Sequence, residues 1–126
     1  LTNEIDSIIH SAALVKHFGN YSLFYQANVQ STINLLELAK DTKNKDFHYI
    51  STLSTLIDGY IPNQNSHTFY EDDDTNILIR SDNVYTQSKS IAEDITAKYR
   101  KHGVSSNIYR VGNLLVNSKK TASMLS

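Results

Sequence analysis

Three short apolar runs alternate with two longer segments of helical periodicity, and this order restricts the chain to few folds. The apolar runs cover residues 6–13 (DSIIHSAA), 46–52 (DFHYIST) and 106–113 (SNIYRVGN). They have the β-branched, aromatic and small residues typical of buried strands. Apolar residues recur at helical spacing over residues 22–40 and 83–102. Strands joined by helical crossovers pair in parallel, so the sequence predicts part of a doubly wound α/β sheet.

Single residues within these segments carry further expectations. The run 6–13 is typical of a strand buried on both faces. In the second helix we expect Glu93 and Lys98 on the outer side and Gly103 as a left-handed stop. Arg110 is expected to pair with a carboxylate from a loop. The packed side of that helix is predicted to consist of Ile91, Ile95 and Tyr99.

Residues 59–82 contain the only proline and the acidic run YEDDDTN, and they predict a long loop with little regular structure. The acidic residues 71–74 indicate a solvated loop, because consecutive carboxylates in a loop do not converge on one ion. The five histidines show no paired spacing for a metal. The sequence therefore predicts no metal site.

Composition narrows the class of protein. The 126 residues suffice for one domain with a core, or for a piece of one. A net charge of −1 gives no electrostatic reason to expect nucleic acid or an anionic membrane as a partner. The chain has no cysteine for a thiolate or a disulfide, and no apolar run approaches the roughly 20 residues that span a bilayer. We expect a cytoplasmic protein.

Tyr85 and Lys89 form a Tyr-x-x-x-Lys pair near the start of the second helix. Hydride addition to a carbonyl leaves an oxyanion that needs a proton, and a phenol with a pKa of roughly 10 releases one reluctantly. An ammonium one helical turn away is expected to lower the pKa of Tyr85. A further hydroxyl would orient the carbonyl. Ser51 and Thr52 are the candidates, and alternation along the strand allows only one of them to meet Tyr85.

Together these segments resemble the extended short-chain dehydrogenase/reductase superfamily. The matching motifs span nearly the whole chain and are DSIIHSAA, ANVQSTINLLELA, FHYISTLST, YTQSK and YRVGN. Within the superfamily, IIHSAALVKHFGNYSLFYQANV, YISTLS, YTQSKSIAED and RVGNLLVNS look most like the thioester reductase domains of nonribosomal peptide synthetases and carboxylic acid reductases. The resemblance implies NADPH-dependent reduction of a carrier-bound acyl or peptidyl thioester to an aldehyde, and in some relatives onward to the alcohol.

The resemblance also implies roles for individual residues. Thr52 is the expected catalytic hydroxyl, with Ser51 as the fallback, beside Tyr85 and Lys89, and Lys89 would also hydrogen-bond the nicotinamide ribose. The family more often has proline where Val111 stands. The implied cofactor is NADPH, with NADH as the alternative, and the implied partner is an acyl or peptidyl carrier protein of a multidomain synthetase. The residues expected at the cofactor are Ser11, Ala12, Ala13, Asn28, Lys89, Val111, Gly112 and Asn113.

The chain departs from the family in what it lacks. Its 4 glycines form no Gly-rich dinucleotide turn, and neither the first strand nor the C-terminal substrate region has a counterpart in it. We therefore expect residues 1–126 to be an internal piece of an NAD(P)-binding Rossmann-like domain. Two other classes stay open. One is another extended family member, such as a nucleotide-sugar epimerase, a dehydratase or a carbonyl reductase; the other is an inactive structural fragment.

Overall fold

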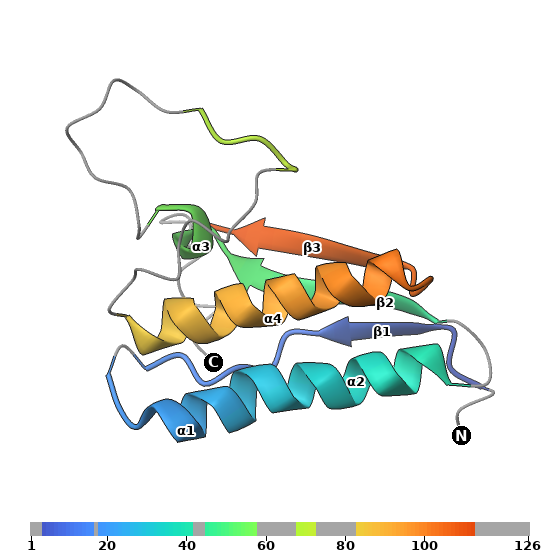
Figure 1. Cartoon of the computed structure of the whole chain (residues 1–126), viewed down its shortest axis with the longest axis horizontal. Coiled ribbons are helices and arrows are strands. Elements are labelled where there is room, and N and C mark those ends of the chain that lie inside the picture. Colours follow the sequence, from blue (N-terminus) through green and yellow to red (C-terminus); the bar gives the residue numbers. More distant parts are fainter. Residues whose placement is uncertain (1–3, 17, 42–44, 58–67, 73–82, 113–126) are drawn as a thin grey trace, which may run out of the picture.

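A parallel three-stranded sheet with its main helices on one face forms the body of the protein (Figure 1). The computed structural model describes residues 4–16, 18–41, 45–57, 68–72 and 83–112. The strands are β1 (Ser7–His10), β2 (Asp46–Thr52) and β3 (Ser106–Val111). The helices are α1 (Tyr21–Phe24), the π-helix η1 (Tyr25–Gln30), α2 (Ser31–Lys40), α3 (Ser54–Ile57) and α4 (Val84–Lys101). The predicted fold class, part of a Rossmann-like parallel sheet, is confirmed.

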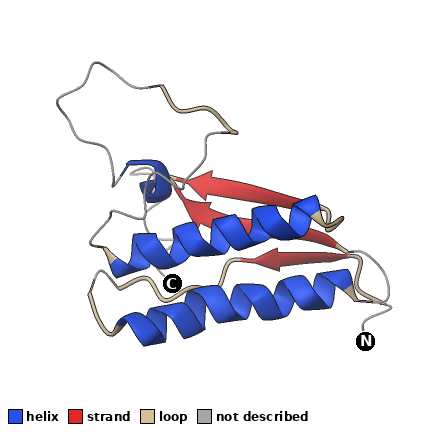
Figure 2. Ribbon diagram, in the orientation of Figure 1, coloured by secondary structure: helices blue, strands red, loops and turns tan. Residues whose placement is uncertain are grey.

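β2 lies at the centre of the sheet and pairs in parallel with both neighbours. Ile9 of β1 lies opposite His48, and Thr52 at the end of β2 lies opposite Val111 at the end of β3. Because all three strands point the same way, their carboxyl ends meet at one edge of the sheet (Figure 2). Ligands bind at this edge in open α/β sheets.

Helices α2 and α4 lie side by side on the same face of the sheet (Figure 1). Phe47 and Tyr49 point from β2 into this layer, since alternate residues of a strand face the same side. They form the core with Leu36, Ala39, Ala92 and Val104, and Ile8, Leu35, Ile95, Tyr99 and Ile108 pack around it. The helices are thus fixed to the sheet by apolar burial, the main favourable term in folding.

The opposite face of the sheet is not covered by any of the described residues. Ile9 of β1 is 70% exposed and Tyr109 of β3 is 45% exposed. The prediction that the first strand is buried on both faces is therefore wrong for the part of the chain that the structure describes. A four-residue strand with two adjacent isoleucines does not reveal from its sequence whether one layer or two covers it.

Capping residues define the ends of α4. The side chain of Asn83 accepts hydrogen bonds from the backbone N–H groups of Tyr85, at 3.0 Å, and Thr86, at 3.3 Å. After Lys101 the chain turns at Gly103, whose φ of 98° lies in the region that favours glycine. The predicted helix over 83–102 and its glycine stop are confirmed.

The first helical segment contains a π-turn that the sequence did not predict. In and after η1, Ser31 donates its hydroxyl proton to the carbonyl of Ala27, and Thr32 donates to the carbonyl of Asn28 at 2.7 Å. Hydroxyl groups that bond the carbonyl four residues back disturb the regular ladder, and π-turns are common at functional sites. Asn28, inside this turn, is 1% exposed.

Of the predicted loop 59–82, the structure describes residues 68–72, which are exposed and form no helix or strand. Asp73 and Asp74 of the acidic run lie outside the described residues, as do His17 and His67. Within the described ranges no three His, Asp or Glu side chains are grouped so as to hold a metal ion. None of the helices in those ranges is long and apolar enough to cross a bilayer.

Candidate active site

The hydroxyl groups of Thr52 and Tyr85 meet at the edge where the strands end. Thr52 is the last residue of β2, and Tyr85 lies in the first turn of α4 directly after its cap. The Thr52 side chain acts as a hydrogen-bonding partner of the Tyr85 phenol. Its Oγ1 also accepts from the backbone N–H of Ser54 at 3.3 Å. Both side chains are only partly buried, so the pair can be approached from solvent.

Ser51 faces the other side of β2 and does not take part in this pair. It is 5% exposed and donates its hydroxyl proton to Glu93 of α4. Alternation along the strand thus separates the two neighbouring hydroxyls, as the sequence requires. Thr52 is the hydroxyl that the fold brings to Tyr85.

Lys89 is buried one turn after Tyr85, with 2% of its surface exposed. Its Nζ donates to the carbonyl oxygen of Ile50 at 2.6 Å and lies 4.2 Å from the centre of the Tyr49 ring. Burial lowers the pKa of Lys89 to about 8, and the charge of Glu93 opposes this shift. The ammonium form therefore still predominates at pH 7.

The pKa of Tyr85 moves in the direction opposite to the prediction. Burial raises it, and the hydrogen bond with Thr52 lowers it by less. The expected depression by Lys89 is wrong because spacing at i, i+4 fixes the helix face but not the direction of a long side chain. The Lys89 ammonium is held at the Ile50 carbonyl and over the Tyr49 ring.

The side-chain amide of Asn28 connects the segment after β1 to α4. Its Oδ1 accepts from the Leu14 N–H at 2.7 Å, while Nδ2 donates to the Leu14 carbonyl at 3.1 Å and to Ser88 Oγ at 2.9 Å. These bonds satisfy both polar groups of a buried amide. Asn28 thus fixes the backbone at Leu14, directly after the predicted cofactor residues Ser11, Ala12 and Ala13.

The remaining predicted cofactor residues lie along the same edge. Ser11 and Ala12 are exposed, and Ala13 is half-buried. Val111 ends β3 opposite Thr52 and is followed by the exposed Gly112. A Cβ at Gly112 would meet only Leu53, at 4.0 Å, so this glycine leaves space but is not required by close packing. Asn113 lies outside the described residues.

This edge fits the nicotinamide end of a dinucleotide. Small or absent side chains at positions 11–13 and 112 allow a flat ring to approach the backbone, and the partly buried hydroxyls of Thr52 and Tyr85 supply polar groups. The Gly-rich turn that would bind the pyrophosphate of such a cofactor has no counterpart in this sequence.

Glu93 lies next to the site and is buried. The prediction that it lies on the outer side of α4 is wrong, because only 2% of its surface is exposed. Its carboxylate accepts from Ser51, from Thr55 Oγ1 at 3.0 Å and from Arg110 Nε at 3.0 Å. Arg110 thus pairs with a helix carboxylate, while the expected pairing with a loop carboxylate stays a prediction. The signal was available, because Glu93 lies four residues after Lys89 and therefore on the same helix face.

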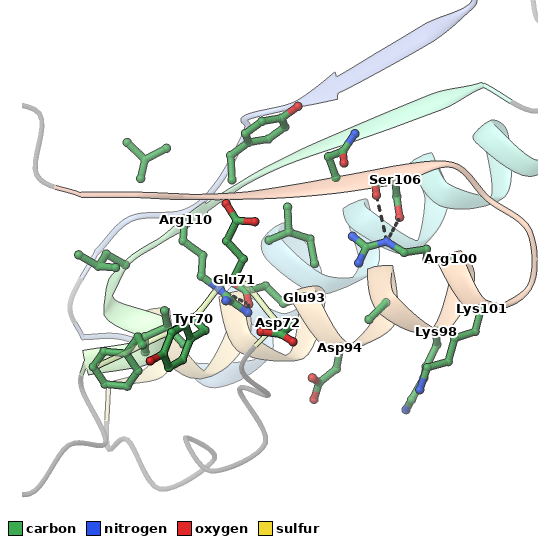
Figure 3. Close-up of a pocket in the computed structure, with 18 residues that line it drawn as sticks. Tyr70, Glu71, Asp72, Glu93, Asp94, Lys98, Arg100, Lys101, Ser106 and Arg110 are labelled. Carbon is green, nitrogen blue, oxygen red and sulfur yellow. Dashed lines mark hydrogen bonds and ion pairs between the residues drawn. The ribbon is translucent and has the colours of Figure 1, made fainter. Parts of the chain in front are cut away.

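A hollow lies beside this site and is lined in part by Val111, one of the predicted cofactor residues, and by Leu53 and Glu93. Figure 3 shows it between α4, β3 and residues 68–72, with Arg110, Glu93 and Glu71 near one end and Arg100 and Lys101 near the other. Thr52, Tyr85 and Lys89 do not line it. The candidate active site therefore rests on the strand-end hydroxyls and not on the size of a cavity.

Known proteins resemble the chain over most of its length. The profile of an NAD-binding family described as "Male sterility protein" matches residues 1–124. The chain is 35% identical over 120 residues to the L-2-aminoadipate reductase of Saccharomyces cerevisiae, covering 89% of this chain and 9% of that protein. It spans 2% to 11% of the length of the curated relatives it matches.

Two solved structures show the same arrangement of elements. The terminal R domain from the myxalamid PKS-NRPS biosynthetic pathway matches with a TM-score of 0.79 and 32% identity, over 93% of this chain and 29% of that chain. A thiolation-reductase di-domain from an archaeal non-ribosomal peptide synthetase matches with a TM-score of 0.67 and 34% identity, over 90% of this chain and 24% of that chain. The chain therefore belongs to this NAD-binding family of extended short-chain dehydrogenases/reductases, and its similarity is to the reductase domains of peptide synthetases and carboxylic acid reductases.

Proposed function

We propose that this chain, within the intact protein, forms the catalytic edge of a reductase that converts a carrier-bound acyl or peptidyl thioester to an aldehyde with NADPH. The approach of Thr52 to Tyr85 at the end of β2, with Lys89 one helical turn on, carries the proposal. These residue types in this arrangement suit a reaction in which negative charge develops on a carbonyl oxygen.

The two hydroxyls act on that oxygen. Burial raises the pKa of Tyr85, so its phenol stays protonated at neutral pH and can donate to the developing oxyanion. Thr52 donates from the other side and orients the carbonyl. Lys89 bonds the Ile50 carbonyl and lies over the Tyr49 ring, so it holds the first turns of α4, where Tyr85 lies, against β2.

One hydride and one proton convert the thioester to an aldehyde and a free thiol. When bound, NADPH supplies the hydride that adds to the acyl carbon. Tyr85 gives its proton to the oxygen, which yields a hemithioacetal on the substrate held by Thr52 and Tyr85. Return of that proton, as the carbonyl re-forms and the carbon–sulfur bond breaks, leaves an aldehyde and a thiolate that takes up a proton as the carrier thiol.

The remaining site residues are assigned to the cofactor. We place the nicotinamide ribose at Lys89 and the flat ring along the Ser11–Ala13 segment and the end of β3 at Val111 and Gly112. Asn113 completes this set as predicted from the sequence. The preference for NADPH over NADH rests on the resemblance to the reductase domains.

The partner follows from the same comparison. A thiolation domain is joined to a reductase domain in one of the matching structures, which supports a carrier domain of a multidomain synthetase as the donor of the thioester. A cytoplasmic location stays a prediction from the composition.

The test follows NADPH oxidation by the intact protein with an acyl thioester of a carrier domain. Wild type should form the aldehyde, and Tyr85→Phe should lose roughly 10²- to 10⁴-fold in kcat. Tyr99→Phe, on the same helix but hydrogen-bonded to Glu37, is the matched control and should retain full activity.

Turnover unaffected by Tyr85→Phe would remove Tyr85 from the mechanism. Tight NADPH binding by wild type without any thioester turnover would move the assignment to a sugar-nucleotide or small-carbonyl enzyme of the same superfamily. Absence of NADPH binding in the intact protein would favour a structural role.

A further inference from the structure

A buried carboxylate with hydrogen bonds to both of its oxygens lies next to the strand end that carries Thr52. Glu93 is 2% exposed, and both of its carboxylate oxygens are occupied. Oε1 accepts from the Ser51 hydroxyl and from Thr55 Oγ1 at 3.0 Å. Oε2 accepts from Arg110, at 3.0 Å from Nε and 2.9 Å from the terminal nitrogen. Four donor contacts from three side chains thus hold one carboxylate in place.

Two of the three donors come from strands that carry site residues, and the third comes from α3, which follows Thr52. Ser51 immediately precedes Thr52 in β2, and Arg110 immediately precedes Val111 in β3. Thr55 of α3 also lies 2.8 Å from the carbonyl oxygen of Thr52, to which it donates. Glu93 itself lies on α4, four residues after Lys89 and eight after Tyr85, and so on their helix face. The carboxylate is therefore the point at which all three site-bearing elements are joined.

Stability alone does not explain a charge at this point. Taking a carboxylate and a guanidinium out of water costs about as much as their attraction returns, and apolar residues of similar volume often serve as well. The hydrogen bonds from Ser51 and Arg110 are directional, so they fix the rotation of α4 and its position along β2. Apolar packing is not directional and does not fix them. Such a shift matters at the site, since a misplacement of about 1 Å can cost roughly 10²-fold in rate.

We propose that Glu93 is a positioning residue, which holds the Tyr85 phenol against the Thr52 hydroxyl by joining α4 to Ser51, Thr55 and Arg110. The inference rests on the proposed function, because it assigns Glu93 to the same reduction. Glu93 does not touch the reacting atoms in this arrangement and acts through the residues that it holds.

Glu93 also affects the charge of Lys89. The groups that interact with the Lys89 charge are His10 from β1, the Tyr49 ring from β2 and Glu93 from α4. Burial lowers the pKa of Lys89 to about 8, and the carboxylate of Glu93 works against that shift. Replacing Glu93 by a neutral isostere should therefore lower the pKa of Lys89 further.

The experiment compares Glu93→Gln with Glu37→Gln in the intact protein. Glu37 is a matched control, because it also accepts a hydroxyl hydrogen bond, from Tyr99, but on the exposed side of α2. In Glu93→Gln we expect kcat to fall roughly ten-fold or more with KM within about two-fold. The basic limb of the pH profile should move to lower pH, while Glu37→Gln should match wild type in all three quantities.

Ser51→Ala separates position from charge and replaces Glu93→Gln if that variant does not fold. It removes one donor to the carboxylate but keeps the charge near Lys89. We expect kcat to fall roughly three- to ten-fold, with the basic limb where wild type has it. If Glu93 had only a structural role, both variants would lower the unfolding temperature, but kcat and the basic limb of the pH profile would not respond differently in the two variants.

Crystal structures of the variants test the inference without any substrate. In Glu93→Gln the separation of Thr52 Oγ1 from the Tyr85 oxygen should grow by roughly 1 Å relative to wild type. If wild type does not turn over a thioester, the proposed function fails and this geometry decides the role of Glu93. An unchanged separation, or an unchanged kcat in an active protein, overturns the inference.

Discussion

The Lys89 ammonium donates a hydrogen bond to the carbonyl oxygen of Ile50 at 2.6 Å, which connects α4 to β2 two residues before Thr52. The same nitrogen lies over the face of Tyr49. Lys89 is therefore part of the packing between helix and sheet as well as a neighbour of Tyr85. Its charge is held in a place from which water is largely excluded, and this has a measurable consequence.

Stability should rise with pH between about 8 and 10.5 because of Lys89. Its pKa is about 8 in the folded protein and 10.5 in an exposed lysine, so in this window the unfolded chain holds a proton that the folded chain has lost. Stability increases with pH wherever the unfolded state binds more protons, here by up to roughly 3 kcal/mol. Below pH 8 the charged form is buried at its full cost, and this group contributes no slope.

Urea denaturation of wild type and Lys89→Met across pH 7 to 10.5 measures this contribution. The difference in unfolding free energy should grow in favour of wild type above pH 8 and stay constant below it. A constant difference over the whole range would mean that Lys89 titrates like an exposed lysine and is not buried in the folded protein.

Thr52 should be replaceable by serine but not by valine. Thr52→Val keeps the shape and removes the hydroxyl that meets Tyr85, so kcat for the proposed reduction should fall roughly 10²-fold. Thr52→Ser keeps the hydroxyl and should stay within roughly ten-fold of wild type. Thr96→Val, which removes a buried hydroxyl bonded to the Ala92 carbonyl within α4, is the control and should leave kcat unchanged. Equal losses in both Thr52 variants would assign the residue to packing.

The course of the chain was predictable because local signals agree with one another. The second strand was expected over 46–52 and is found at Asp46–Thr52. The last helix was expected over 83–102 and is found at Val84–Lys101, between an asparagine cap and a glycine with positive φ. The spacing of the apolar residues, the N-terminal cap and the C-terminal glycine all depend on neighbouring residues, so they can be recognised without the tertiary structure.

Two features could not be predicted in this way. The π-turn depends on which rotamers the hydroxyl side chains of the helix adopt, and the burial of Glu93 depends on partners far away in the sequence. The hydroxyl of Thr32 can point to solvent or bond the Asn28 carbonyl, and only the packed structure decides. Glu93 is buried because Arg110 and Ser51 arrive from two strands. The sheet edge at which the site residues lie could be predicted from the parallel topology. The direction of the Tyr85 pKa shift could not, because it depends on how deeply the phenol is buried.

Asn28 should be intolerant of substitution even by aspartate. Asn28→Ala removes the three hydrogen bonds to Leu14 and Ser88 and takes their partner from the partly buried N–H and carbonyl of Leu14, at a cost of roughly 2 kcal/mol in unfolding free energy. Asn28→Asp keeps the acceptor for the Leu14 N–H but loses both donors and buries a charge, so it should be no better than alanine. Urea denaturation measures both.

Asn34→Ala is the control for Asn28. Asn34 lies on the exposed side of α2 and its side chain accepts a hydrogen bond from Gln30, so its loss should change stability by no more than about 0.5 kcal/mol. If Asn28→Ala were as mild as Asn34→Ala, the segment after β1 would be held by something other than this amide.

His10 should make the protein less stable as the pH falls from about 7 to 5. Its ring is 3% exposed, lies 5.5 Å from the Tyr49 ring, and places Nε2 at 3.1 Å from Thr32 Oγ1. Burial first, and then the charge of Lys89, lower the pKa of His10, so the unfolded chain takes up a proton below pH 6.5 before the folded chain does. Stability is then lost as the pH falls through this range.

Urea denaturation at pH 8, 6.5 and 5 measures this loss of stability. At pH 8 the imidazole is neutral in both states, so this pH is the reference. The loss of unfolding free energy between pH 8 and pH 5 should be smaller in His10→Gln than in wild type. Parallel curves for the two proteins would show that His10 is not the group responsible.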